Sequence, residues 1–429
     1  MAEHLKRSLP SEVEASDGVR STVTEMLSRI EREGLDAVRH YSRTLDGWDP
    51  PSFRVQQDEV EAAATLVDAE LRDHIATAQA QVRLFAESQR GTLRELELEP
   101  QPGVVLGHRH IPIDAVGAYV PSGRYPMLAS AFMTVLVAKV AGVPRVVGCA
   151  PPWQGQGIHP AVLHSIATSG ADEIYCVGGV QALAMLAFGV GGVAPIDMLV
   201  GAGNAYVAEA KRQLFGRVGI DLIAGPTEIL VIADETSDAQ LVAADLLGQA
   251  EHGPTSPAIL ISVSRQLALD VIAQVDDMLE ALPDTAVAAT AWRDHGEVIV
   301  VESDAEAIEL ANVFAPEHLE VQVEASVLDT YFDGLRNYGS LFLGEEATVV
   351  YGDKAIGTNH VLPTKRAARY TGGLWVGKFL KTVTYQRVTA EGSARVAPVA
   401  AAISEAELFA GHALTARMRL ERAAQHVDG

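Results

Sequence analysis

From about Pro112 onward, short apolar runs rich in β-branched residues alternate with alanine-rich stretches of helical periodicity. The runs expected to form strands are residues 115–120, 145–149, 173–177, 197–200, 228–233, 258–263, 297–301 and 340–343. Strands that are separated by helical segments usually pair in parallel and carry helices on both faces. The sequence therefore predicts an α/β fold, and the group of strands after Thr227 predicts a second α/β lobe.

The two ends of the chain have the pattern of helices. Apolar residues recur every three or four positions from Val19 to Ser42, and the chain after Val396 is rich in Ala, Glu and Arg. We therefore expect an N-terminal extension (1–18), a discontinuous first lobe (19–118 and 228–373), a second lobe (119–227) and a C-terminal helical tail (374–429). A cleft between two such lobes is a common place for a ligand.

Charge and composition narrow the class of protein. The 429 residues carry a net charge of −23, which disfavours nucleic acid as a partner. The chain has no unbroken apolar run of about 18 residues, and its first residues lack the apolar segment of a signal peptide. Cys149 and Cys176 lie in apolar strand-like runs and are expected to be buried thiols. These features predict a cytoplasmic protein with neither nucleic-acid nor membrane partners.

One predicted helix, in DAQLVAADLLGQAEHGP, ends in two potential metal ligands. Ser237 or Asp238 can cap its start, and Gly253–Pro254 stops it. Gln249 and His252 are three positions apart, so both side chains leave from one face of the last turn. An amide oxygen and a neutral imidazole at this spacing can share a divalent cation. A hydrogen-bonded polar helix end is the alternative interpretation.

Glu317 and His318 are adjacent in FAPEHLEV, directly after Pro316. Proline suits the first turn of a helix, because its missing N–H has no partner there, so we expect a helix to begin at this point. A carboxylate and an imidazole at a helix start offer two different proton acceptors. An ordinary charged helix N-terminus is the alternative.

The stretch MLVGAGNAYVAEAKRQL predicts a strand, then a turn through Gly201, Gly203 and Asn204, and then a helix. This order allows the backbone to approach a ligand closely. Tyr206 occupies the third glycine position of the dinucleotide fingerprint GxGxxG, so the stretch does not by itself identify a dinucleotide site.

The segment from Asp353 to Arg387 inverts the charge of the chain. After Asp353 it contains no Asp or Glu and seven basic residues: Lys354, Lys365, Arg366, Arg369, Lys378, Lys381 and Arg387. Such an inversion predicts attraction of an anion, which could be a pyrophosphate, an anionic substrate or an acidic face of a partner subunit. A basic solvated loop is the alternative.

Together these segments resemble one family. The run VGAGNAYVAEAKRQLFGRVGIDLIAGPTEILVIAD, followed by AADLLGQAEHG, FAPEHLE and GTNHVLPT, is similar in order and spacing to histidinol dehydrogenase, from about Val19 to Arg419. The resemblance implies two Rossmann-like lobes with helical extensions. It also implies a zinc enzyme that uses NAD twice, taking a primary alcohol through an aldehyde to a carboxylate. Finally, it implies a homodimer in which the C-terminal tail reaches the partner subunit.

By motif position, the resemblance implies a set of site residues. The metal ligands would be Gln249, His252, Asp353 and, from the second subunit, His412 in ELFAGHA. Glu317 and His318 match the catalytic pair, in which His318 takes the alcohol proton and Glu317 activates water to attack the aldehyde. The NAD-contacting positions match Tyr119, Gln181 and Asn204, and the substrate-contacting positions match Thr227, His360 and Glu407. Oxygen and nitrogen ligands without cysteine suit Zn²⁺.

Departures from the family's pattern bear on the substrate. The family's GPGN is GAGN here, its AGPSE is AGPTE, and TSP replaces DSQ after QAEHGP. Lys354 follows the metal-binding aspartate where an aromatic residue is common, and Arg124 and Tyr125 appear after YVP. Added cations fit a cationic amino alcohol poorly, but they can pair with a sulfonate or carboxylate. We therefore expect Lys354 to contact an anionic substrate.

Two further stretches, GRYPMLASA and ARYTGGLWVGKFLKT, resemble a paralogous branch of the family, the sulfopropanediol 3-dehydrogenases. The favoured prediction is therefore oxidation of (R)-2,3-dihydroxypropane-1-sulfonate to sulfolactate. L-histidinol is the first alternative, and the retained Glu407 favours it, because this position contacts the imidazole in the family. A non-catalytic scaffold of the same fold is the second alternative. Retention of six site residues argues against it: Gln249, His252, Glu317, His318, Asp353 and His412.

Overall fold

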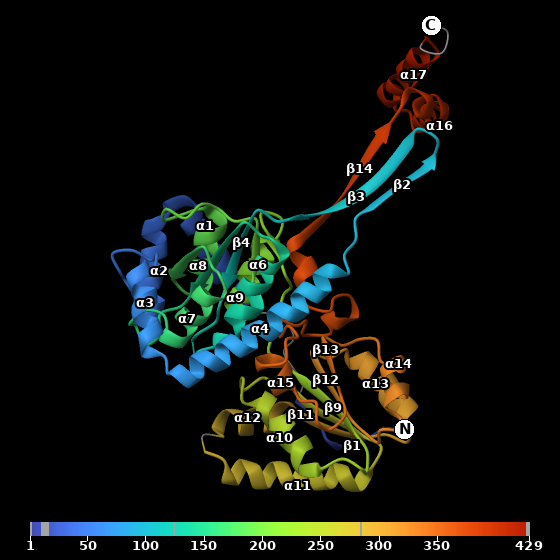
Figure 1. Cartoon of the computed structure of the whole chain (residues 1–429). Coiled ribbons are helices and arrows are strands. Elements are labelled where there is room, and N and C mark those ends of the chain that lie inside the picture. Colours follow the sequence, from blue (N-terminus) through green and yellow to red (C-terminus); the bar gives the residue numbers. More distant parts are fainter. Residues whose placement is uncertain (1, 10–16, 124, 284, 426–429) are drawn as a thin grey trace. The chain divides into compact units, whose positions relative to one another are not determined.

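The computed structural model describes residues 2–9, 17–123, 125–283 and 285–425 (Figure 1). The chain forms two compact units. Unit 1 comprises Met1–Ser88 and Ile113–Lys378, and unit 2 comprises Gln89–Pro112 and Phe379–Gly429. Unit 1 contains two largely parallel sheets, whereas unit 2 contains a small antiparallel sheet and two helices.

The first sheet of unit 1 has five parallel strands in the order β6-β5-β4-β7-β8. These strands are β4 (Ala115–Tyr119), β5 (Arg145–Ala150), β6 (Glu173–Cys176), β7 (Met198–Val200) and β8 (Gly219–Ile220). The connecting helices are α5 (Leu128–Ala131), the π-helix η1 (Phe132–Leu136), α6 (Val137–Ala141), α7 (Pro160–Thr168), α8 (Gly179–Phe188) and α9 (Ala205–Leu214). The chain moves outward from β4 to β6 and then returns to the other side at β7. This reversal is the topological switch point of a doubly wound sheet.

Three helices from the N-terminal part of the chain pack against the helices of this first sheet. They are α1 (Asp17–Glu33), α2 (Leu35–Asp46) and α3 (Gln57–Leu66), and the long α4 (Ala69–Gly91) follows them. Val23, Ile30 and Val38 share one buried core with side chains of β4, β5 and β7. The division made from the sequence grouped residues 19–118 with 228–373 instead. An apolar stripe shows that a helix is covered, but not which sheet covers it.

The second sheet of unit 1 has six strands in the order β1-β11-β10-β9-β12-β13, of which only the edge strand β1 is antiparallel. They are β1 (Glu3–Lys6), β9 (Ile229–Ala233), β10 (Ala258–Ser262), β11 (Gly296–Val300), β12 (His318–Gln322) and β13 (Ser340–Leu343). One face packs against α10 (Ala239–Ala250), α11 (Arg265–Ala281) and α12 (Ala286–His295), and the other against α13 (Asp304–Phe314) and α14 (Leu328–Gly334) (Figure 1). The short helices α15 (Val349–Lys354), η2 (Ala367–Arg369) and η3 (Val376–Phe379) follow β13.

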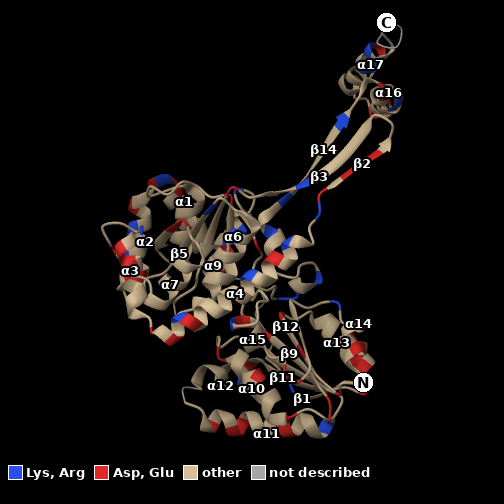
Figure 2. Ribbon diagram, viewed as in Figure 1, with Lys and Arg blue, Asp and Glu red and all other residues tan. Residues whose placement is uncertain are grey.

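Unit 2 is an antiparallel ribbon with two helices. Its strands are β2 (Leu96–Gln101), β3 (Val104–Pro112) and β14 (Leu380–Val388), in the order β14-β3-β2, and its helices are α16 (Ala390–Ala406) and α17 (Ala410–Gln425). Glu97 on β2 accepts hydrogen bonds from Tyr385 (2.6 Å) and Arg387 (2.8 Å) on β14. The central strand has Gly107 at this level, which leaves room for the two outer strands to make contact. Acidic residues on β2 and basic residues on β14 are visible in Figure 2.

The structure confirms the predicted α/β fold with two Rossmann-like sheets, and each of the eight predicted strands is present within a residue or two. Cys149 and Cys176 are buried thiols, as expected. Arg124 lies outside the described residues. Within the described part of the chain, no helix is both long and apolar enough to cross a membrane.

One local prediction is wrong, because FAPEHLEV does not begin a helix. Helix α13 ends at Phe314, Ala315 adopts a left-handed conformation (φ 48°), and β12 begins at His318. Pro316 therefore follows the end of a helix, where proline is also common. Every residue of β12 is buried, so the strand lacks the polar alternation that would have distinguished it.

Candidate active site

Several candidate residues meet where two neighbouring strands begin. Strands β9 and β12 pair in parallel, with Ile229 opposite His318. Thr227 and Glu228 precede β9, and Glu317 precedes β12. These side chains therefore gather at the amino edge of the six-stranded sheet.

Glu317 is held by its neighbours across this edge. Its Oε2 accepts hydrogen bonds from Thr227 Oγ1 (2.5 Å) and from the backbone N–H of Glu228 (3.0 Å), and Gln249 Nε2 donates to Thr227 Oγ1. Burial raises the pKa of Glu317, while His318 and the two hydrogen bonds oppose the rise. Burial and the charge of Glu317 raise the pKa of Glu228 to about 8. Glu317 is thus a fixed carboxyl group whose affinity for a proton is increased.

His318 is oriented by a backbone carbonyl. Its Nδ1 lies 3.0 Å from the carbonyl oxygen of Glu228. Because a carbonyl oxygen can only accept, Nδ1 carries the proton and Nε2 keeps a lone pair in the neutral ring. Nε2 is buried without a hydrogen-bond partner in the described residues, and it lies 3.6 Å from Asp353 Oδ1. Burial lowers the pKa of His318, but Glu317 and Asp353 outweigh this effect and raise it to about 9. At neutral pH the ring therefore carries a proton on both nitrogens, and Nε2 is the nitrogen that can release a proton and take it back.

Gln249 and His252 lie at the end of α10. Asp238 caps the start of this helix by accepting a hydrogen bond from the N–H of Gln240 (2.7 Å), as one of the two predicted caps. Gln249 is buried, and His252 is half-buried just beyond the last turn. Burial lowers the pKa of His252, and the charge of Asp353 opposes this effect, so these two residues are electrostatic neighbours.

Asp353 is nearly buried in α15 and is surrounded by groups that favour its charge. Burial alone would raise its pKa, but His318, His360 and Lys354 hold the pKa of Asp353 well below its usual range. Its backbone oxygen lies 3.1 Å from His360 Nδ1, while His360 Nε2 lies 3.0 Å from Ser130 Oγ. Lys354 Nζ lies 3.7 Å from Asp353 Oδ2, and its side chain is 45% exposed. Ser130 was not predicted, since it lies 230 positions from its partner.

Three of the four predicted metal ligands, Gln249, His252 and Asp353, therefore belong to unit 1. Among the described residues, no three His, Cys, Asp or Glu side chains are gathered so that they could hold a metal ion by themselves. The three predicted ligands include only two residues of those types, because the third donor is an amide. Amide, imidazole and carboxylate donors fit Zn²⁺ chemically, with further positions left for another donor and for substrate.

Glu407 and His412 belong to unit 2. Glu407 directly follows α16 as its C-cap residue, His412 lies in the first turn of α17, and both are exposed. The ring of His412 lies 5.3 Å from that of Phe409, centroid to centroid. All the other predicted metal, catalytic and substrate residues belong to unit 1.

The three predicted NAD contacts lie at the carboxyl edge of the five-stranded sheet. Tyr119 ends β4, Gln181 is in the first turn of α8 after β6, and Asn204 precedes α9 after β7. Asn204 caps α9 by accepting hydrogen bonds from the N–H groups of Tyr206 (3.0 Å) and Val207 (3.1 Å). Tyr119 and Asn204 flank the switch point between β4 and β7, which is where doubly wound sheets bind dinucleotides.

A buried ion pair holds the turn after β7. The N–H of Gly201 donates to Asp221 Oδ2 (2.7 Å), and Lys211 Nζ donates to the carbonyl oxygen of Gly201 (2.8 Å) and to Asp221. Gly201 has φ +114°, and a Cβ there would lie 2.1 Å from the carbonyl oxygen of Tyr119. The turn therefore requires glycine at this position.

Asp46 is a further polar residue at this edge that sequence reasoning missed. Its Oδ2 accepts a hydrogen bond from Gln181 Nε2 (2.8 Å), and Gln181 Oε1 is buried without a partner in the part of the chain described. Burial raises the pKa of Asp46, and the hydrogen bond from Gln181 opposes the rise. Asp46 ends α2, and no local motif marks it as a neighbour of Gln181.

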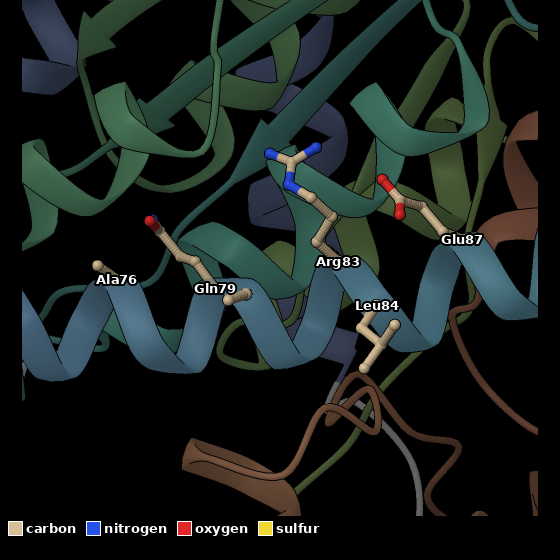
Figure 3. Close-up of a pocket in the computed structure, with 6 residues that line it drawn as sticks. Ala76, Gln79, Arg83, Leu84 and Glu87 are labelled. Carbon is tan, nitrogen blue, oxygen red and sulfur yellow. The ribbon is translucent and has the colours of Figure 1, made fainter.

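A groove of about 300 Å³ runs along one side of α4, between Ala76, Gln79, Ala80, Arg83, Leu84 and Glu87 (Figure 3). None of the predicted site residues lines it. The groove is therefore separate from both candidate edges.

Comparison with known proteins identifies the family. The family model for histidinol dehydrogenase matches residues 9–420. The chain belongs to the histidinol dehydrogenase family. Histidinol dehydrogenases and their homologues are NAD-dependent oxidoreductases that act on CH–OH groups, and this chain is an enzyme of that class.

Relatives of the chain carry different names. The chain is 52% identical to a histidinol dehydrogenase homolog from Shouchella clausii, over 98% of this chain and 99% of the relative. It is 48% identical to a sulfopropanediol 3-dehydrogenase from Ruegeria pomeroyi, over 98% and 96% of the two chains. The crystal structure of histidinol dehydrogenase from Elizabethkingia anophelis has a TM-score of 0.91 at 34% identity and covers 97% of this chain and 94% of its own. The family is thus shown, while its members carry more than one substrate name.

Proposed function

We propose that this enzyme is a zinc- and NAD-dependent dehydrogenase that oxidises a small anionic primary alcohol through the aldehyde to the carboxylate. The favoured substrate is (R)-2,3-dihydroxypropane-1-sulfonate, which would give sulfolactate. One observation carries the substrate proposal: the side chain of Lys354 is half-exposed, and its ammonium nitrogen lies 3.7 Å from Asp353, a proposed metal ligand. A cation at this place can pair with a sulfonate. The 48% identity to a sulfopropanediol 3-dehydrogenase supports the same substrate.

The proposed zinc ligands are Gln249, His252 and Asp353, with His412 supplied by a second copy of the chain, which makes one zinc ion per subunit. Thr227 and His360 would contact the substrate from one copy and Glu407 from the other. Bound zinc would supply Lewis-acid polarisation of the substrate hydroxyl, and bound NAD a hydride acceptor for each of the two oxidations. Tyr119, Gln181 and Asn204 would hold NAD at the carboxyl edge of the five-stranded sheet.

The catalytic pair would handle the protons. His318 Nδ1 is occupied by the carbonyl oxygen of Glu228, so Nε2 is the atom that takes the proton of the alcohol. Glu317 would then take a proton from the water that attacks the aldehyde. Its raised pKa favours this role, since a carboxylate of higher proton affinity is a stronger base. Thr227 and the N–H of Glu228 fix the carboxylate for this step.

We also propose a cytoplasmic homodimer. Unit 2 exposes many apolar side chains, including Leu408, which is 90% exposed. Leu98 and Leu106 are opposite each other on β2 and β3, and Leu96 lies on the same face of the ribbon. Apolar surface of this kind is typical of a subunit interface. Buried free thiols are in keeping with a reducing compartment.

Two alternatives have some support. L-histidinol as substrate is favoured by the retained Glu407 and by the relatives named after histidinol. A non-catalytic scaffold is disfavoured, because it would not require Glu317, His318 and Asp353 to be buried next to one another.

The decisive experiment measures NADH formation from dihydroxypropanesulfonate and from histidinol, each with and without a zinc chelator. We expect turnover of the sulfonate that the chelator abolishes. A clear preference for histidinol would overturn the substrate proposal. No turnover of either alcohol by zinc-loaded protein would favour the scaffold.

Lys354→Met and Lys354→Arg test the anion contact. Lys354→Met should raise the Michaelis constant for the sulfonate about tenfold or more, because a hydrogen bond to a charged group contributes about 1.5–3 kcal/mol. Lys354→Arg should keep most of the affinity, and neither variant should change the Michaelis constant for NAD. Lys381→Met, which removes an exposed lysine on β14, is the matched control. An unchanged constant for the sulfonate in Lys354→Met would exclude Lys354 as the anion contact.

A further inference from the structure

A buried polar cluster connects the elements that carry the candidate active site. It consists of Asp245 on α10, Glu320 and Gln322 on β12, and Thr348 at the start of α15. Glu320 and Gln322 are fully or almost fully buried. Helices α10 and α15 and strand β12, which meet here, lie close together in Figure 1.

Helix α15 begins in an unusual way. Thr348 occupies the N-cap position, where its hydroxyl oxygen would ordinarily accept a hydrogen bond from the first turn. Here the hydroxyl donates to Asp245 Oδ1 (2.9 Å), and the N–H of Val349 donates to Glu320 Oε1 (2.8 Å). Glu320 on the neighbouring strand thus satisfies an N–H group that would otherwise be buried without a partner.

The same carboxyl group is connected to α10. Gln322 Nε2 donates to Glu320 Oε2 (3.1 Å) and to Asp245 Oδ2 (2.8 Å), and Glu320 also hydrogen-bonds Asp245 directly. Burial and the charge of Asp245 raise the pKa of Glu320 to about 8. At neutral pH Glu320 therefore keeps its proton and can donate it to Asp245.

Asp245, Glu320 and the backbone of Val349, which Glu320 binds, are each one structural repeat away from a site residue. Val349 and Asp353 are four positions apart on α15, and Asp245 and Gln249 are four positions apart on α10, so each pair lies on one helix face. Glu320 and His318 are two positions apart on β12 and point to the same face of the sheet. A displacement of Glu320 would therefore move both helices that carry the proposed metal ligands.

We propose that Glu320 is a positioning residue for the metal site, which holds α15 through Val349 and α10 through Asp245 so that Asp353, Gln249 and His252 are arranged before the metal binds. The proposal rests on the proposed zinc-dependent function. Outer groups that fix the orientation of metal ligands commonly change metal affinity by about 10- to 100-fold. Glu320 contacts neither substrate nor NAD in this arrangement, so its effect should appear first in the binding of the metal.

Two replacements of similar size separate positioning from simple packing. Glu320→Gln keeps an acceptor for Val349 and a donor for Asp245, whereas Glu320→Leu keeps the volume and loses both. We expect zinc affinity, measured on the full-length apoenzyme by competition with a chromophoric chelator, to fall about 10- to 100-fold in Glu320→Leu. In Glu320→Gln it should stay within about threefold of the unaltered enzyme. At saturating zinc, the fold-loss of kcat in Glu320→Leu should be smaller than its fold-loss of zinc affinity.

A control variant tests whether the loss of any buried hydrogen bond near this sheet lowers zinc affinity. Tyr331→Phe removes a hydrogen bond from a buried hydroxyl to Asp304 (2.7 Å) on the other face of the sheet. It should lower the melting temperature without changing zinc affinity. Thr348→Val, a milder change in the cluster itself, should weaken zinc several-fold and serves if Glu320→Leu does not fold.

The outcomes distinguish the two proposals. If the unaltered enzyme binds no zinc, the proposed metal site fails and the role of Glu320 fails with it. If the unaltered enzyme binds zinc tightly and Glu320→Leu and Thr348→Val bind it equally well, only the role of Glu320 is refuted. If Tyr331→Phe loses as much zinc affinity as Glu320→Leu, the loss is a result of general destabilisation. This outcome would also refute the role of Glu320.

Discussion

Replacement of Gly201 by alanine should disturb the candidate NAD edge while leaving the candidate metal ligands intact. Gly201 has φ +114°, and an added Cβ would lie 2.1 Å from the carbonyl oxygen of Tyr119. The obstructing atom belongs to the backbone of β4, so it cannot rotate away as a side chain could. The turn that leads to Asn204 must therefore move, and with it one of the proposed NAD contacts.

The magnitude follows from two contributions. A left-handed conformation costs a non-glycine residue roughly 1–2 kcal/mol. Overpacking a tight site costs about 1–3 kcal/mol more. A total on the order of 3 kcal/mol would lower the melting temperature by about 6–12 °C, taking roughly 2–4 °C per kcal/mol for a domain of this size. If the displaced turn loses the contact with NAD, the Michaelis constant for NAD should rise about tenfold for each 1.4 kcal/mol of binding lost.

Gly192→Ala provides the matched control. Gly192 also has a positive φ, +86°, but a Cβ there would meet nothing within 4 Å. Gly192→Ala should therefore lower the free energy of unfolding by the conformational contribution alone, roughly 1–2 kcal/mol, and should leave NAD binding unchanged. Thermal unfolding and NAD saturation curves of both variants, recorded with zinc present, give the comparison. If Gly201→Ala matched Gly192→Ala in both measurements, the proposed closeness of the turn to NAD would be refuted.

Two more predictions concern single carboxyl groups. Glu317→Gln should lower the rate of aldehyde oxidation by about 10²–10⁴-fold while the first NADH still forms, so the aldehyde should accumulate and be trapped by a hydrazine reagent. If Glu317→Gln slowed alcohol oxidation and aldehyde oxidation equally, a role of Glu317 in aldehyde oxidation alone would be excluded. The raised pKa of Glu320, about 8, means that the folded apoenzyme keeps a proton that the unfolded chain loses above about pH 4.3. The free energy of unfolding should therefore fall as pH rises from about 4.5 to 8, and Glu320→Gln should remove part of that slope in denaturant titrations. An identical slope in both proteins would show that Glu320 does not keep its proton in the folded apoenzyme.

The parts of the fold that follow from local pattern were predictable. Parallel strands buried on both faces appear as short apolar runs, and these were located within a residue or two. The capping of α10 by Asp238 is also a local matter, since the acceptor and the N–H of Gln240 are two positions apart. Motif similarity then gave the candidate site residues, and unit 1 contains the predicted catalytic pair and three of the four predicted metal ligands.

Contacts between distant parts of the chain were not predictable from one sequence. Asp46 meets Gln181 across 135 positions, and Ser130 meets His360 across 230. No local spacing marks such pairs, because they depend on which strands become neighbours. The error at Pro316 has a different origin: proline is tolerated both at the start of a helix and after its end, and the burial of all of β12 removed the alternation that would have decided.

The two sheets share a strand order, yet their candidate sites lie at opposite edges, and electrostatics accounts for the difference. At the carboxyl edge of a parallel sheet the following helices begin, and their N-termini carry partial positive charge. Asn204 and α9 provide such an end at the proposed NAD site, which suits a pyrophosphate. At the amino edge the helices end, and their C-termini carry partial negative charge. Gln249 and His252 lie at the end of α10, where this field favours a cation. A repeated fold can therefore hold an anionic cofactor in one lobe and a metal ion in the other without any change of topology. A structure with both bound that placed the pyrophosphate against the end of α10 would contradict this account.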